Sequence, residues 1–121
     1  VTRSICMNVL ISNTGVSWTH KNKVVSVQLQ DIQSALAHEA SNVAFALHAV
    51  PMGTELVSFS LDGNERFRVL PPPDGRFSYL TLHPKLGPLV VITYATQHNG
   101  WFDWHHTIGP NGELTKSSPA Y

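Results

Sequence analysis

The stretch GRFSYLTLHPKLGPLVVITYATQHNGWFDWHHTI, residues 75–108, decides the fold class of this chain. It contains three runs rich in β-branched and aromatic residues, at residues 76–82, 89–96 and 101–108, and such residues favour β-strands. The runs are separated by HPKLGP and QHNG, whose glycine, proline and asparagine residues are typical of turns. Because connections this short join antiparallel neighbours, the stretch predicts consecutive up-and-down strands.

The same succession of strand and turn signals extends in both directions. Further strands are predicted at residues 5–11, 16–19, 23–29, 43–50, 54–61, 65–70 and 113–117. The separators PMG, DGN, PPPDG and GPNG again have the composition of turns. We therefore expect seven to nine of these strands to form a curved, mostly antiparallel β-sheet, arranged as a meander or a partly rolled barrel.

One segment, QDIQSALAHEASN at residues 30–42, has helical periodicity. Ile32, Ala35, Leu36 and Ala40 fall on one stripe of a helix, which predicts a short α-helix near residues 30–41. Because so short a helix is not stable by itself, we expect it to pack on the sheet. The expected fold class is therefore α+β, in a single domain over residues 1–121.

The composition argues against several classes of partner. The chain has 42% hydrophobic and only 13% charged residues, and eight Lys and Arg balance eight Asp and Glu. Nucleic acids and anionic membranes select for a basic excess, so neither is expected as a partner.

Cys6 is the only cysteine, so no intrachain disulfide can form and a cytoplasmic location is expected. Its side chain lies in an apolar run and is predicted to be buried.

The two faces of the predicted sheet differ in polarity. Pairing of residues 65–70 with residues 76–82 across PPPDG would place Phe67, Val69, Phe77 and Tyr79 on the core face. The opposite face would carry both Arg66 and Arg68, together with Ser78 and Leu80. This second face mixes polar and apolar residues, and the surface charge is low. Both features favour self-association, and we expect a homodimer.

Candidate catalytic residues occur in HNGWFDWHH, residues 98–106. Asp103 and His105 lie two apart, so they share a face of a strand, where a carboxylate can make imidazole a general base. If QHNG is a four-residue loop, these two residues face the same side as Tyr94, whereas a slip by one residue reverses this. Apolar content instead favours burial of the other set, which is Phe102, Trp104 and Ile108. No nucleophile motif accompanies the pair, so a small hydrolase, isomerase or lyase is an alternative hypothesis only.

Metal binding is not expected, although the chain contains seven histidines. His105 and His106 are adjacent, so a regular strand directs them to opposite faces and they cannot hold one ion together. His38 and Glu39 lack the second histidine of an HExxH motif. We predict neither a metal nor another cofactor.

The composition and motifs most favour a non-enzymatic domain that binds a small molecule or a protein. The candidate ligand-binding residues are aromatic residues able to line a cavity and arginines able to hold a carboxylate or phosphate. They are Tyr79, Tyr94, Trp101, Trp104, Arg66 and Arg68. The main alternative is a protein antagonist of the toxin-immunity type. In general character this short, motif-poor chain resembles the products of mobile bacterial gene cassettes.

Overall fold

The computed structural model describes the backbone of residues 6–120 and the side chains of residues 8–120, so the prediction for Cys6 lies outside the described side chains. The described residues form strands in three antiparallel sheets and no helix. The fold is therefore all-β, and the predicted α+β class with one curved sheet is wrong.

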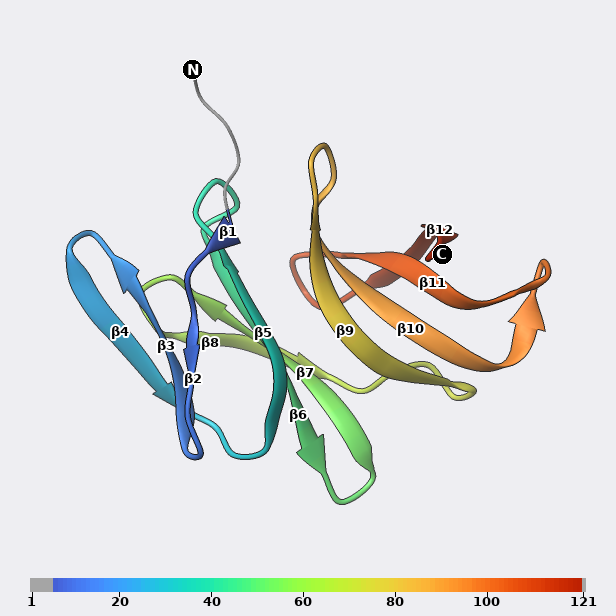
Figure 1. Cartoon of the computed structure of the whole chain (residues 1–121), viewed down its shortest axis with the longest axis horizontal. Helices are drawn as coiled ribbons and strands as arrows, with labels where there is room; N and C mark the ends of the chain where they lie inside the picture. Colours follow the sequence, from blue (N-terminus) through green and yellow to red (C-terminus); the bar gives the residue numbers. More distant parts are fainter. Residues whose placement is uncertain (1–5, 121) are drawn as a thin grey trace.

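The three sheets stack as layers (Figure 1). The five-stranded sheet has the order β1 (Cys6–Met7), β5 (Ile32–His38), β6 (Val43–Val50), β7 (Gly53–Ser60) and β8 (Glu65–Val69). The four-stranded sheet has the order β12 (Leu114–Pro119), β11 (Trp101–Ile108), β10 (Gly87–His98) and β9 (Gly75–His83). The three-stranded sheet consists of β2 (Leu10–Ile11), β3 (Gly15–His20) and β4 (Lys23–Gln28). The five-stranded sheet lies between the other two.

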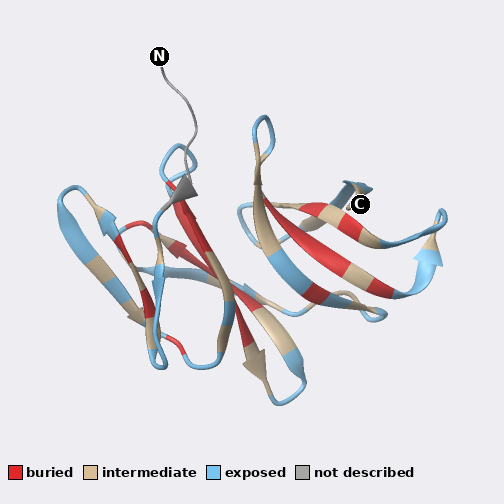
Figure 2. Ribbon diagram, in the orientation of Figure 1, coloured by how far each residue is buried: buried red, intermediate tan, exposed pale blue. Residues whose placement is uncertain are grey.

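Two apolar cores lie between the layers, and Figure 2 shows buried residues on strands of all three sheets. Large side chains from the five-stranded sheet, including Phe45 and Leu47, pack against the four-stranded sheet. Smaller side chains on the opposite face, including Ala44 and Ala46, pack with the three-stranded sheet around Trp18. Because β6 contributes to both cores, six consecutive residues, Val43–His48, are buried.

The predicted helix at residues 30–41 is wrong because the segment forms β5, an inner strand covered on both faces. Leu36 points to the four-stranded sheet, whereas Ala35 and Ala37 point to the three-stranded sheet. A strand buried on both sides does not alternate apolar with polar residues. Its alanines and its single leucine therefore fit a helical pattern as well as they fit a strand pattern. Alanine also has the highest helix propensity.

The predicted pairing of residues 65–70 with residues 76–82 is also wrong. Strand β8 pairs with β7, and β9 pairs with β10, so PPPDG connects two different layers. A bulge at Ser78 then changes the face of the residues before and after it, because Val91 pairs with Tyr79 while Ile92 pairs with Phe77. Phe77 lies in the core as expected, but Tyr79 is 47% exposed.

Candidate functional site

The structure distributes the predicted aromatic residues over two faces of the four-stranded sheet. Tyr94 and Trp104 lie in the core beneath this sheet, whereas Tyr79 is exposed on its outward face. Trp101 is 42% exposed and begins β11 beside a two-residue turn. Tyr79 therefore does not share a cavity with Tyr94 and Trp104.

Asp103 and His105 share the outward face of this sheet. The turn before β11 consists of Asn99 and Gly100, both with positive φ, and Trp104 is the residue that pairs with the core residue Ile92. Trp104 is buried and Ile108 packs against the core, but Phe102 is exposed.

The side-chain hydrogen bonds of Asp103 and His105 join them to different partners. Asp103 Oδ1 accepts a hydrogen bond of 2.7 Å from Thr93 Oγ1, and His105 Nδ1 lies 3.4 Å from Ser118 Oγ. A general base that depends on the carboxylate requires a direct bond between the two side chains. This geometry therefore gives no support to the catalytic hypothesis.

A histidine that the sequence analysis did not single out as functional, His106, is instead buried with two hydrogen-bond partners. Its Nε2 lies 2.7 Å from Tyr94 Oη, and its Nδ1 lies 3.0 Å from the carbonyl oxygen of Trp104. The carbonyl can only accept, so Nδ1 carries the proton and Nε2 accepts from the tyrosine hydroxyl. Burial lowers the pKa of His106 below its ordinary value, and the charges of Lys116, His105 and His98 add to this.

We expect the free energy of unfolding to fall as the pH is lowered through 6.5, the ordinary pKa of histidine. In the folded state the pKa of His106 is lower, so the unfolded chain binds more protons between the two values. The contribution of neutral His106 to the free energy of unfolding is complete above pH 6.5 and is lost as the pH approaches the pKa of His106 in the folded state. Urea denaturation between pH 7.5 and pH 5 measures this slope.

The His106→Gln variant should remove this contribution and flatten the slope relative to the wild type. His105→Gln is the matched control because His105 lies on the opposite face of the same strand. It removes only one of the smaller contributions to the lowered pKa of His106, so its slope should stay closer to that of the wild type than the slope of His106→Gln does. An unchanged slope in His106→Gln would contradict the assignment.

The two arginines predicted to act together lie on opposite faces of the five-stranded sheet. Ser58 pairs with Phe67 while Phe59 pairs with Glu65, so a bulge makes Arg66 the extra residue. Arg68 donates hydrogen bonds to Glu65 and Glu55. The first of these bonds lowers the pKa of Glu65. Arg68 is therefore committed to carboxylates of the chain itself.

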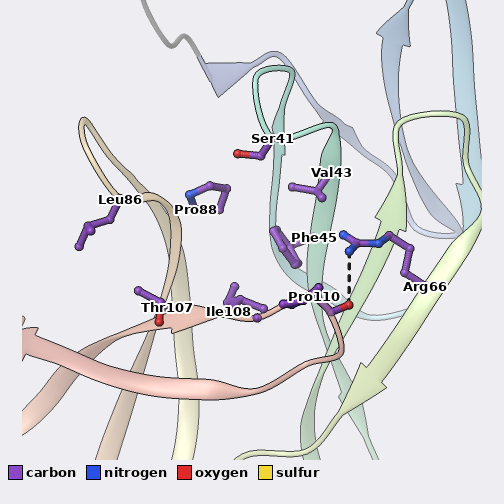
Figure 3. A pocket seen from close by; sticks show the side chains of 10 residues that line it. Ser41, Val43, Phe45, Arg66, Leu86, Pro88, Thr107, Ile108 and Pro110 are labelled. Carbon is purple, nitrogen blue, oxygen red and sulfur yellow. Dashed lines mark hydrogen bonds between the residues drawn. The ribbon is translucent and has the colours of Figure 1, made fainter.

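Arg66 lines a groove of about 260 Å³ between the five-stranded and four-stranded sheets (Figure 3). The groove is formed by strands β6, β8, β10 and β11 together with three turns. Its lining residues are Ser41, Val43, Phe45, Arg66, Leu86, Pro88, Thr107, Ile108, Gly109 and Pro110. Most of these are apolar, and two offer a hydroxyl group, so the groove suits a ligand with an apolar part and a polar end.

The guanidinium group of Arg66 is held at one side of this groove by neutral partners. Its Nη1 donates to Ser58 Oγ at 3.4 Å, and its Nη2 donates to the carbonyl oxygen of Pro110 at 3.3 Å. The second bond is the dashed line in Figure 3. The guanidinium carbon also lies 5.7 Å from the centre of the Phe67 ring. These contacts fix the orientation of the cation and leave other N–H groups for a ligand.

No carboxylate of the described residues neutralises Arg66, because none of the ion pairs found in residues 6–120 includes it. The acid nearest along the chain to the Pro110 turn, Glu113, is engaged elsewhere. Hydrogen bonds from its own backbone N–H group and from that of Asn111 lower its pKa. The groove therefore carries a positive charge that the chain itself does not compensate.

A buried histidine adjoins the same groove. His38 Nδ1 lies 2.7 Å from the hydroxyl of Ser41, and Ser41 lines the groove. His38 is only 3% exposed, and its Nε2 is a buried polar atom without a hydrogen-bond partner. The imidazole fixes the Ser41 hydroxyl at the wall of the groove.

Sequence reasoning identified Arg66 but missed the rest of this groove. Its other residues come from segments far apart in the chain: Leu86 and Pro110 lie in predicted turns, and Ser41 lies in the segment that was predicted to be helical. Within the described side chains, no group of three or more His, Cys, Asp or Glu residues could hold a metal ion. Residues 6–120 contain no helix long and apolar enough to cross a membrane.

Comparison with known proteins finds no matching family model, no similar curated protein and no similar solved structure. The fold and the groove geometry are therefore the observations on which a function can be argued.

Proposed function

We propose that this chain is a non-enzymatic binding module for a small organic anion that has an apolar tail. The observation that carries the proposal is the position of Arg66, an uncompensated cation held at the side of an apolar groove. Guanidinium groups bind carboxylates and phosphates through charge-assisted hydrogen bonds. The hydroxyl groups of Ser41 and Thr107 supply further polar contacts at the groove wall.

The size of the groove limits the ligand. At about 260 Å³ it lies just below the range of roughly 300–1,000 Å³ typical of sites for drug-sized molecules. The apolar residues Val43, Phe45 and Ile108 favour a hydrocarbon tail over a second charged group. A short monocarboxylate therefore fits this groove better than a nucleotide or a polyanion.

Titration calorimetry with hexanoate tests the proposal, with hexanamide as the neutral analogue of similar shape. Arg66→Gln should weaken hexanoate binding by roughly tenfold or more, because a hydrogen bond to a charged group contributes about 1.5–3 kcal/mol. Hexanamide should bind the wild type less tightly than hexanoate.

Arg68→Gln is the matched control, because Arg68 lies on the opposite face and is paired with glutamates. It should leave hexanoate binding within about twofold of the wild type, since a distant surface charge has a small effect. Equal binding of hexanoate by wild type and Arg66→Gln, or no binding by the wild type at millimolar concentration, would refute the proposal.

Two further expectations accompany this proposal. A homodimer is expected from the low surface charge, and a cytoplasmic location suits a chain with one cysteine. The toxin-immunity alternative stays a prediction from the sequence alone.

A further inference from the structure

A second group of polar side chains lies outside the groove, where β10 and β12 meet the connection between β8 and β9. Lys116 Nζ lies 2.7 Å from His98 Nδ1, and His98 Nε2 lies 3.1 Å from Asp74 Oδ2. The three residues come from separate segments, so no local sequence motif reveals the arrangement. Two hydrogen bonds therefore connect the amine, the imidazole and the carboxylate in one chain.

The direction of these two hydrogen bonds follows from the chemistry of the end groups, which are the amine of Lys116 and the carboxylate of Asp74. The ammonium group of Lys116 can only donate and the carboxylate of Asp74 can only accept. His98 therefore accepts from Lys116 at Nδ1 and donates to Asp74 from Nε2. In this arrangement the imidazole of His98 is neutral, and the lone pair of its Nδ1 is directed at the amine.

Aromatic rings fix the position of the amine and the imidazole. The rings of Tyr94 and His98 are stacked, with centres 3.9 Å apart. Lys116 Nζ lies 4.7 Å from the centre of the Tyr94 ring and 5.1 Å from that of Trp104. Such contacts hold the ammonium group against the two rings, and its proton can pass directly to His98 along the hydrogen bond.

From this geometry we infer that Lys116 is a nucleophilic amine, that His98 is its general base and that Asp74 orients His98. A nucleophile in hydrogen-bond reach of a base that a third group orients is the general signature of an activated nucleophile. The chemical class of co-reactant is a small aromatic aldehyde, because Tyr94 and Trp104 flank the amine. Asp74 and Tyr94 also line a cavity of about 400 Å³ beside this group.

The reaction is the formation of an imine. The Lys116 ammonium gives a proton to His98 Nδ1, and the free amine attacks the carbonyl carbon to form a carbinolamine. The nitrogen passes one proton to the carbonyl oxygen, so the carbinolamine is neutral, and its hydroxyl group leaves as water after taking up the proton held by His98. The nitrogen lone pair then forms the C=N bond, so the products are the protonated Lys116 imine, one molecule of water and neutral His98, with no oxidant or reductant. Asp74 stabilises the imidazolium that forms between these steps.

Reductive trapping of the full chain tests this inference. Benzaldehyde at limiting concentration with sodium cyanoborohydride converts each imine into a stable benzyl amine, and peptide mass spectrometry gives the rate at each lysine. The exposed Lys21, Lys23 and Lys85 serve as internal references. We expect Lys116 to be labelled at least about threefold faster than any of them, because general bases accelerate such steps by roughly 10²–10⁴ in favourable cases.

Variants separate the roles of the three residues. His98→Gln should lower the rate at Lys116 about tenfold or more without changing the reference lysines. Asp74→Asn should also lower the labelling rate at Lys116. Asp74→Glu keeps a carboxylate to orient His98, so its rate should lie between those of Asp74→Asn and the wild type. Labelling of Lys116 no faster than the references, or unchanged by His98→Gln, would overturn the inference. Neither outcome bears on the groove at Arg66, which shares no lining residue with this cluster.

Discussion

Leu47→Ala is expected to lower the free energy of unfolding by about 3–5 kcal/mol. Leu47 lies at the centre of β6 and is fully buried in the core between the five-stranded and four-stranded sheets. Strands on both sides hold the backbone, so the surroundings cannot collapse into the space left by the side chain. Urea denaturation followed by tryptophan fluorescence measures the loss.

Leu70→Ala is the control for this experiment, because Leu70 is 53% exposed. Its free energy of unfolding should stay within about 0.5 kcal/mol of the wild type. A loss below about 1 kcal/mol in Leu47→Ala would contradict the placement of this residue in a closely packed core.

Trp18→Ala is expected to cause a loss of similar size, about 3–5 kcal/mol, in the other core. Trp18 is 3% exposed, and its ring centre lies 6.3 Å from that of Phe59. Its Nε1 donates a hydrogen bond of 2.9 Å to the carbonyl oxygen of Leu61. The alanine variant loses this packing and leaves a buried carbonyl oxygen without its partner.

Trp18→Phe should lose less than Trp18→Ala, because it keeps an aromatic ring and gives up the hydrogen bond and part of the volume. Thermal unfolding of the alanine variant should still show one transition, since both cores share the five-stranded sheet. Two separate transitions would show that the three-stranded sheet unfolds as an independent unit.

The strands of this fold were largely predictable because most of them end at strong turn signals. Predicted residues 43–50 coincide with β6, and predicted residues 101–108 coincide with β11. In such segments β-branched and aromatic residues meet glycine, proline or asparagine at both ends, so length and type follow from local chemistry.

The arrangement of the strands was not predictable from local chemistry. Whether PPPDG closes a hairpin or connects two layers depends on which apolar faces find each other, and its own residues permit both. The bulges at Arg66 and Ser78 each reverse the faces of a strand, although neither residue is a glycine that would mark a bulge. The faces assigned by alternation were therefore wrong for Arg66, Tyr79 and Leu80, whereas Phe67, Val69 and Phe77 lie on the core side as predicted.

The candidate sites show the same limit. Arg66 could be chosen from the sequence as an anion-binding residue, but its separation from Arg68 depends on a bulge. His98 stood out in the sequence only as the first residue of HNGWFDWHH. Its partners Asp74 and Lys116 become visible only when the order of the four-stranded sheet is known.

Strand β6 is buried on both faces, which makes partly folded states of this protein prone to aggregate. The sequence VAFALHAV contains no Lys, Arg, Asp or Glu, and segments with high β-propensity and no charge are prone to aggregate when exposed. An intermediate in which either outer layer has detached would present this ribbon to solvent. Solubility during synthesis and refolding therefore depends on how quickly the flanking hairpins close over it.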